Sequence, residues 1–253
     1  MKEFEIKAAL DAAGFENARG EARLLAERFG DDVPADVVRR RLDHEPLQYL
    51  LGEWWFRRER YHVSPDCLIP RADTETLVEE AIRHLPQGAR FLDLCTGSGC
   101  VAVSTLCERP DATAVAVDLF ENTLALARRN AAENGVAERC AFCRADVLAD
   151  PPELGLFDAV VANPPYIPEA VVPTLSAEVQ HEPPAALCGG PDGLNFYRAM
   201  LTRWARLLKP GGFWLFEIGY DQADALRRLA AEHGLSPAVT RDLGGRDRVV
   251  RLT

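Results

Sequence analysis

From about residue 76 onward the chain alternates between strand-like and helix-like segments, and this alternation constrains the possible folds more than any other feature. It predicts a mostly parallel seven-stranded sheet with helices on both faces, a Rossmann-like α/β fold that binds ligands beyond the carboxyl ends of its strands. The two final strands, joined by the short turn 243–245, are expected to pair antiparallel. The strand-like segments are 90–95, 113–118, 140–144, 157–162, 213–218, 238–242 and 248–252. The helix-like segments are 100–108, 121–134, 195–208 and 221–233.

The first 75 residues have a different pattern. Apolar residues recur there at helical spacing, and Gly14, Gly30 and Pro46 provide breaks between helices. Aromatic and β-branched residues then flank a polar turn between Trp54 and Val63, which is typical of a β-hairpin. We therefore predict a helical domain over residues 1–53, a hairpin and linker over 54–75, and a larger domain over 76–253.

Composition excludes several classes of protein. The chain has 253 residues, 47% of them apolar, but no apolar run of the roughly 18 residues that a membrane span needs. Its first five residues are acidic in character and lack the apolar stretch of a signal peptide, so we expect a cytoplasmic protein without membrane association. The seven cysteines are scattered, which favours reduced, buried thiols. Cys140 and Cys143 have CxxC spacing, but no second pair or histidine completes a metal site, and none is predicted.

The net charge of −10 argues against direct nucleic-acid binding, since proteins that bind along a duplex usually present a basic face. Two local arginine clusters stand out, at residues 39–41 and 57–60. Because many acidic residues surround them, we interpret both as solvated surface.

The segment Leu92 to Gly99 contains the first candidate site. A strand that ends in Gly-x-Gly and leads into a helix lets the backbone approach a ligand closely and directs helix N-terminal amides toward it. This signal is weak by itself, because Gly97-x-Gly99-x-x-Ala102, with Asp118 following 21 residues after Gly97, also satisfies the dinucleotide fingerprint. An NAD-dependent oxidoreductase therefore remains an alternative at this point.

Two acidic residues at the ends of later strands are candidates for nucleoside binding. Asp118 can accept hydrogen bonds from both ribose hydroxyls, which suits a nicotinamide nucleotide and S-adenosylmethionine equally. Asp146 can accept from the exocyclic amine of an adenine, with Val147 beside the ring. The alternative for Asp146 is a helix N-cap before Leu148.

The segment Asn163-Pro164-Pro165-Tyr166 distinguishes these chemistries. A planar amide nitrogen is a poor nucleophile because its lone pair is delocalised, so an enzyme that methylates it must hold the group firmly. The Asn163 side-chain oxygen and the Pro164 carbonyl can each accept one N–H, the two proline rings fix this backbone, and Tyr166 can pack against the planar target. Its predicted place beyond the end of a strand, opposite the glycine loop, favours this function over a simple turn.

These motifs together resemble a known family. Residues 163–166 and the 93–99 loop are similar to methyltransferases that act on exocyclic or amide nitrogens. The segments 69–75, 190–194, 217–219 and 241–248 further resemble the PrmC (HemK) family, the peptide-chain release factor glutamine methyltransferases, over nearly the whole chain. The resemblance implies a class I S-adenosylmethionine-dependent methyltransferase domain that methylates the Gly-Gly-Gln glutamine of class I release factors. It also implies that the N-terminal domain helps to hold the release factor and that the cofactor leaves as S-adenosylhomocysteine.

Carried over by position, the resemblance assigns functional residues. Arg71, Thr74 and Glu75 are expected either to order the cofactor pocket or to cap the helix that begins near Thr74. Two positions depart from the family: Cys95, where Gly is common, and Ala72, where Pro is frequent. The expected substrate residues are Asn163, Pro164, Pro165 and Tyr166, with Asn163, Pro164 and Tyr166 catalytic. The expected cofactor residues are Asp93, Cys95, Thr96, Gly97, Ser98, Gly99, Asp118, Asp146, Val147 and Asn163.

Other functions fit part of the pattern. A ribosomal-protein glutamine methyltransferase would share residues 163–166 but differ upstream, around residues 70–75. An adenine-specific DNA methyltransferase would use the same catalytic logic but should carry a basic DNA-binding region. An oxidoreductase gives no reason for Asn163 to Tyr166, and a non-catalytic module would bind the cofactor without turnover.

Overall fold

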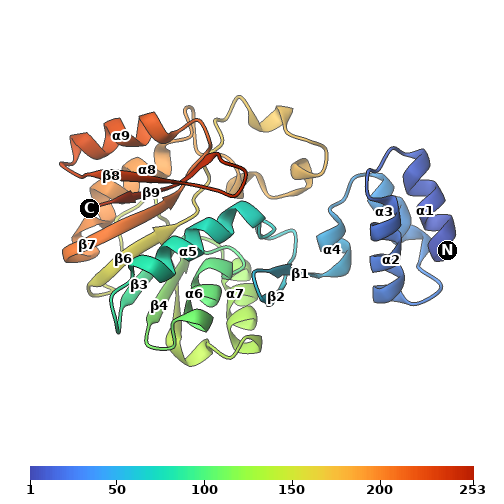
Figure 1. Cartoon of the computed structure of the whole chain (residues 1–253), viewed down its shortest axis with the longest axis horizontal. Coiled ribbons are helices and arrows are strands. Elements are labelled where there is room, and N and C mark those ends of the chain that lie inside the picture. The colour runs from blue at the N-terminus through green and yellow to red at the C-terminus, as the bar shows by residue number, and fades with distance from the viewer.

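The computed structural model describes all 253 residues, which form a helical part and a larger sheet part joined by a small hairpin (Figure 1). The helical part contains α1 (Glu3–Ala12), α2 (Ala18–Phe29), α3 (Ala35–Leu42) and α4 (Leu47–Leu51). Its apolar side chains, including Ile6, Leu10 and Leu25, are buried in a cluster of their own. None of the helices in the chain is long and apolar enough to cross a membrane.

The predicted hairpin is confirmed. Strands β1 (Glu53–Phe56) and β2 (Glu59–His62) pair antiparallel, and Arg57 in their turn has a φ of 53°. Asn130 connects this hairpin to the sheet part, because its side chain bonds the backbone of both His62 and Ser98. The hairpin is thereby held beside the loop that contains Gly97 and Gly99.

The sheet has the order β5-β4-β3-β6-β7-β9-β8, and its first five strands are parallel. The chain leaves β3 toward β4 and β5 and then returns to place β6 on the other side of β3. The loops after β3 and β6 therefore diverge, which opens a crevice between them at the carboxyl edge. The strands are β3 (Arg90–Leu94), β4 (Thr113–Asp118), β5 (Cys140–Arg144), β6 (Phe157–Ala162), β7 (Leu208–Glu217), β8 (Pro237–Arg241) and β9 (Asp247–Leu252).

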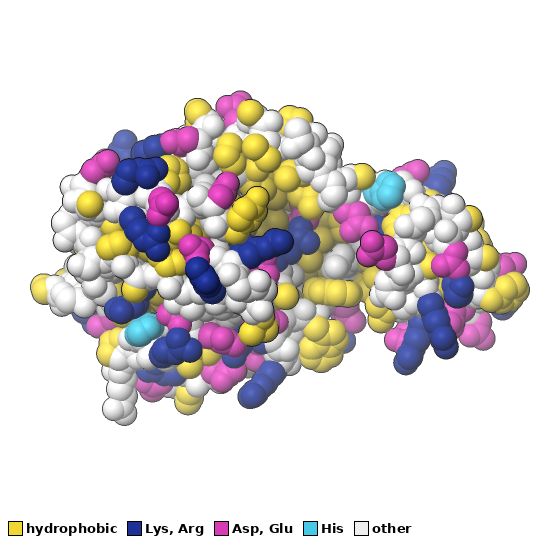
Figure 2. Space-filling view, turned by 45° about the horizontal axis from the view of Figure 1, so that its top comes forward, with side chains coloured by type: hydrophobic (Ala, Val, Ile, Leu, Met, Phe, Trp, Pro, Cys, Tyr) yellow, Lys and Arg dark blue, Asp and Glu magenta, His cyan; other side chains and the backbone are white.

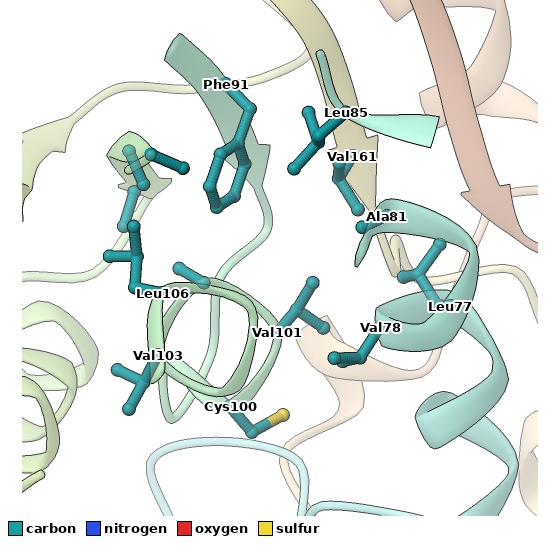
Figure 3. Packing of buried hydrophobic residues seen from close by; sticks show 14 of the residues in the cluster. Leu77, Val78, Ala81, Leu85, Phe91, Cys100, Val101, Val103, Leu106 and Val161 are labelled. Atoms are coloured by element: carbon teal, nitrogen blue, oxygen red, sulfur yellow. The ribbon is translucent and has the colours of Figure 1, made fainter. Parts of the chain in front are cut away.

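Helices cover both faces of this sheet, as the sequence predicts. One face packs against α5 (Glu75–His84), α6 (Cys100–Glu108) and α7 (Glu121–Glu133), and the other against α8 (Asn195–Ala199) and α9 (Ala223–Glu232). Figure 3 shows the first layer, where Leu77 of α5 and Val101 of α6 face Phe91 and Val161 of the sheet. Burial of such side chains contributes roughly 1.5 to 3 kcal/mol each, so this packing fixes the strand ends that bear the site.

Several predicted boundaries differ from the structure, most of them by one or two residues. Strand β7 begins at Leu208, five residues before the predicted start, because a register shift opposite Phe157 lets the Pro-Gly-Gly segment continue the strand. The helix predicted over 195–208 is regular only to Ala199 and continues as a π turn and a 3-10 turn. Strand β3 ends at Leu94, and Cys95 leaves it with a φ of 59°. The predicted antiparallel pair at the C-terminus is confirmed, with β9 lying between β7 and β8.

Candidate active site

Two cavities open at the carboxyl edge of the sheet, and they share Asn163 and Arg71 in their walls. The first, of about 390 Å³, follows the loop after β3, and we call it the glycine-loop cavity. The second, of about 400 Å³, is bounded by Pro164 and Tyr166, and we call it the Tyr166 cavity. The predicted residues that line the glycine-loop cavity are Arg71, Thr74, Cys95, Thr96, Gly97, Ser98, Asp118, Asp146, Val147, Asn163 and Pro165.

The loop after β3 depends on unusual backbone conformations. Gly99 has a φ of 82°, and a Cβ atom there would lie 3.2 Å from the Cβ of Ala127 in α7, so both its conformation and its close packing favour glycine. Cys95 adopts a similar left-handed conformation with a side chain present. Such a residue costs on the order of 1 to 3 kcal/mol, which gives a physical reason why glycine suits this position. The Cys95 side chain also lines the glycine-loop cavity, and burial raises the pKa of its thiol.

Asp93 lies beneath this loop. Its carboxylate accepts a hydrogen bond of 2.6 Å from the Thr96 hydroxyl, and burial raises its pKa to about 7. Neither Asp93 nor Gly99 lines the glycine-loop cavity, so each is placed to shape the loop. Direct contact of these two residues with a cofactor stays a prediction.

Two carboxylates lie at separate points of the glycine-loop cavity. Asp118, at the end of β4, accepts the Gly97 N–H at 3.0 Å and the Phe120 N–H at 3.2 Å, and burial raises its pKa. Asp146 accepts the Leu148 N–H at 2.8 Å within a turn, so the helix N-cap considered for it is wrong. A carboxylate oxygen has two lone pairs, and both side chains therefore keep acceptor capacity for a ribose and an adenine amine.

Asn163 occupies the boundary between the two cavities, directly after β6. Its Nδ2 donates to Oγ1 of Thr74 at 3.2 Å, whereas its Oδ1 accepts no hydrogen bond within the protein. The neighbouring Pro164 carbonyl oxygen is likewise without a donor from the protein. Two acceptors that could hold a planar N–H₂ group thus lie in one wall.

Several contacts fix the backbone of Tyr166 behind these acceptors. Gly193 packs so closely against it that a Cβ atom there would lie 2.2 Å from the Tyr166 carbonyl oxygen. The Gln222 side chain donates to that same oxygen at 2.9 Å, and the Tyr166 hydroxyl donates to Oε1 of Glu217 at 3.4 Å. The segments 190–194 and 217–219 therefore support the Asn-Pro-Pro-Tyr backbone.

In the segment 71–75, three residues with predicted roles each make a specific contact in the structure. Thr74 precedes α5, but its hydroxyl makes no capping hydrogen bond and instead meets Asn163, so the capping interpretation is wrong. Arg71 pairs with Glu182, a buried carboxylate that also accepts the Ile69 N–H at 3.0 Å. Glu75 accepts the Arg57 N–H and thereby orders the hairpin at a distance from both cavities.

Some residues that build the site were not predicted from the sequence. Asn130 and Glu182 are polar side chains buried by contacts distant in sequence, and no local pattern indicates their partners. Leu119 and Phe120 line the glycine-loop cavity, and an apolar pair directly after Asp118 could have suggested this.

The interpretation of the arginine clusters as solvated surface is wrong for two of their members. Arg41 is 3% exposed and pairs with Glu21 and Glu178. Arg57 contacts Glu108 at 2.9 Å and is largely covered. Arg41 is buried and Arg57 is largely covered by packing between segments, which a local charge pattern does not reveal.

The arrangement suits transfer of a small group to a planar nitrogen. A nucleoside-bearing ligand in the glycine-loop cavity would meet two carboxylates, and an amide in the Tyr166 cavity would meet two carbonyl acceptors. Because Asn163 belongs to both walls, the two reacting groups could meet beside it.

Comparison with known proteins agrees with this architecture. The family model described as methyltransferase small domain matches residues 72–186. The ribosomal protein L11 methylase of Lactobacillus delbrueckii subsp. bulgaricus has the same fold, with a TM-score of 0.53 and 22% identity over 72% of this chain and 79% of that one. The sheet order and the paired cavities thus define a class I, Rossmann-like methyltransferase.

The particular family follows from relatives of higher identity. A release factor glutamine methyltransferase of Caulobacter vibrioides is 41% identical over 85% of this chain and 75% of its own length. One of Moorella thermoacetica is 42% identical over 89% of this chain and 83% of its own length. The chain belongs to the release factor glutamine methyltransferase family, and the oxidoreductase alternative is excluded.

Proposed function

We propose that this chain transfers a methyl group from S-adenosyl-L-methionine to the side-chain amide nitrogen of the Gly-Gly-Gln glutamine in class I peptide-chain release factors, and thereby modulates translation termination. The observation that carries the proposal is the position of Asn163, whose acceptor-capable Oδ1 lies in the wall between two cavities. The similarity to release factor glutamine methyltransferases supports the same substrate.

The residues of the glycine-loop cavity fit S-adenosylmethionine. Asp118 would accept from the ribose hydroxyls, Asp146 from the adenine amine, and Val147 would pack against the base. When bound, this cofactor supplies an electrophilic methyl group on a sulfonium sulfur, and it leaves as S-adenosylhomocysteine. No three His, Cys, Asp or Glu side chains gather in a way that could hold a metal ion, and the proposed chemistry uses none.

The protein's contribution is mainly to position the amide. The Asn163 Oδ1 and the Pro164 carbonyl would each accept one N–H of the glutamine, and the Tyr166 ring would cover its plane. Hydrogen bonds of this kind contribute about 1 kcal/mol each, whereas alignment of two reacting groups can contribute up to roughly 7 to 11 kcal/mol. The N-methylated amide cation then loses its proton readily, without a dedicated base.

The remaining expectations form part of the same proposal. Residues 1–53 would act as a substrate-recognition domain, 54–75 as hairpin and linker, and 76–253 as the catalytic domain. The enzyme would act in the cytoplasm on a protein partner, with neither nucleic acid nor membrane bound directly. The net charge of −10 argues against direct nucleic-acid binding, and therefore against DNA methylation.

The test is transfer of radiolabelled methyl from S-adenosylmethionine to a purified class I release factor. Its controls are a release factor whose Gly-Gly-Gln glutamine is replaced, and the enzyme variant Asn163→Ala. We expect label on the normal factor only, and turnover lowered by orders of magnitude in Asn163→Ala with cofactor affinity little changed. Label on ribosomal proteins instead would favour the ribosomal-protein alternative. Cofactor binding without label on any protein would favour a non-catalytic module.

A further inference from the structure

Residues 168–187, which we call the bridging segment, form one wall of both cavities. Leu175 and Val179 line the Tyr166 cavity, whereas Pro183 and Ala185 line the glycine-loop cavity. The segment contains only three 3-10 turns of three residues each, so regular secondary structure does little to fix its shape. In Figure 1 it is the gold stretch that extends from the sheet part toward the helical part.

The helical part holds the first half of this segment through an ion pair. Nη2 of Arg41, in α3, lies 2.5 Å from Oε1 of Glu178, and Nε2 of His181 lies 3.0 Å from the Asp43 carbonyl oxygen. Figure 2 shows acidic side chains gathered at this junction. Glu178 is next to Val179, so the ion pair acts directly on the wall of the Tyr166 cavity.

Arg41 is itself held rigidly. Its side chain is 3% exposed, and its guanidinium donates twice to Glu21 in α2 and once to the Glu45 carbonyl and lies 4.3 Å from the ring centroid of Phe15. A charge this deeply buried is kept only where its donors are satisfied, so its direction is fixed by the helical part. Glu178, by contrast, is 44% exposed and is the partner that can move.

The second half of the segment has an anchor of its own. Glu182 is 2% exposed, pairs with Arg71 and accepts the Ile69 N–H, and all three residues belong to the sheet part or its linker. The glycine-loop cavity therefore has a wall that does not depend on Arg41. Arg71 lines both cavities, so its pair with Glu182 supports both, whereas the Arg41 contact reaches only the wall of the Tyr166 cavity. Loss of the Arg41 contact should therefore affect the Tyr166 cavity alone.

We propose that Arg41 and Glu178 are positioning residues through which the helical part fixes the 175–181 wall of the Tyr166 cavity in the shape that accepts the substrate. The identity of that substrate rests on the proposed function, whereas the coupling between the parts rests on these contacts. Without the ion pair, substrate binding must also order this wall, so the enzyme binds its protein substrate less well while its cofactor affinity is kept.

The test compares Glu178→Ala, in the full chain, with Glu169→Ala as a control. Glu169 is an exposed acidic residue of the same segment that makes no ion pair, so its removal changes the charge equally. Three quantities are measured: KM for a release factor, Kd for S-adenosylmethionine by calorimetry, and hydrogen exchange of residues 172–182 in the free enzyme. The Gln180 and His181 amides, bonded to Ser176 and Glu178 carbonyls, report on this wall.

For Glu178→Ala we expect a KM raised several-fold, an unchanged cofactor Kd, and faster exchange over 172–182. Glu178→Gln, which keeps a hydrogen-bonding oxygen, should fall between this variant and the unmodified enzyme. Glu169→Ala should match the unmodified enzyme in all three. An unchanged KM overturns the proposal, as does a raised KM with unchanged exchange, which would mean direct contact of Glu178 with the release factor. If the unmodified enzyme does not label a release factor, the proposed function fails. Unchanged hydrogen exchange over residues 172–182 in Glu178→Ala would separately overturn the coupling between the helical part and the cavity wall.

Discussion

At the scale of single residues, the orientation of the Asn163 amide is the central feature of the site. The Thr74 hydroxyl accepts from Nδ2 of Asn163, and it also lies beside the buried Glu217 carboxylate, whose pKa it helps to lower against the effect of burial. A hydroxyl that accepts on one side can direct its single hydrogen to a carboxylate on the other. This arrangement keeps the Asn163 oxygen facing the substrate.

We predict that Thr74→Val lowers kcat about tenfold or more, because loss of one hydrogen bond that sets an orientation corresponds to roughly 1.4 kcal/mol. The valine side chain has a similar shape but no hydroxyl. Thr74→Ser, which keeps the hydroxyl, should retain most of the activity, and cofactor Kd should change little in either. Steady-state kinetics with calorimetry would check this. Equal kcat for the valine variant and the unmodified enzyme would exclude the positioning role.

The roles of single residues could be predicted from the sequence where the interacting groups are neighbours along the chain. Asn163 to Tyr166 could be interpreted because four adjacent residues carry the acceptors, the rigid backbone and the ring. The role of Thr74 could not, since it lies 89 positions away from its partner Asn163. The same applies to Glu182, whose two contacts cross more than 100 residues. Assignments of individual residues to cofactor and substrate remain predictions.

At the scale of elements, one buried arginine connects the C-terminal hairpin to the site. Arg248, in β9, bonds Asp242 at the start of the β8–β9 turn, the Ile218 carbonyl after β7, and Asp73 before α5. Arg248 and Asp242 are both almost fully buried. This explains physically why residues 241–248 form a motif: the turn is held against the segment that precedes Thr74.

We predict that Arg248→Met lowers the free energy of unfolding by about 3 to 5 kcal/mol, because it leaves the Asp242 carboxylate buried without its partner. The matched control is Arg241→Met in the same hairpin, where the pair with Asp247 is largely exposed and its loss should cost less than about 1 kcal/mol. Urea unfolding of both variants would measure the difference. Similar losses for the two would contradict the role of the buried pair.

Most elements of the sheet part agree with their predicted ranges because apolar periodicity and strand composition are strong local signals. The order of strands is a different matter, since no local pattern indicates that β9 lies between β7 and β8. The early start of β7 was also missed, because Pro210 and Gly211 normally disfavour a strand. Tertiary pairing with β6 overrides that preference.

At the scale of the whole molecule, burial determines which charged groups affect the stability of the folded protein. The local charge pattern around Arg41 is that of solvated surface, but contacts within the helical part, together with the ion pair to Glu178, remove this side chain from water. In the sheet part, Asp93 and Glu217 are buried beneath the two cavities, and burial raises the pKa of each to about 7. Both carboxyl groups therefore hold protons more tightly in the folded state than in the unfolded chain.

This difference fixes the sign of the pH dependence. Between about pH 4.5 and pH 7 the folded state binds more protons at these two groups, so their stabilising contribution, complete at lower pH, is lost as pH rises through 7. Each group contributes a slope of up to about 1.4 kcal/mol per pH unit over that window. Carboxylates whose pKa is lowered by hydrogen bonds, such as Asp158 and Asp192, act in the opposite sense at more acidic pH. Stability should therefore be greatest in weakly acidic solution.

Replacement of one buried carboxyl group separates its contribution to the pH dependence of stability from the contributions of the other titratable groups. Glutamine at position 217 is neutral at every pH, so we predict that in Glu217→Gln the fall of Tm between pH 5 and pH 8 is smaller than in the unmodified protein. Glu169→Gln, an exposed change of the same kind, should reproduce the unmodified slope. Scanning calorimetry at several pH values would measure all three proteins. A slope unchanged in Glu217→Gln would mean that this carboxylate is ionised at neutral pH without cost, because Arg248 and Thr74 stabilise its charge fully.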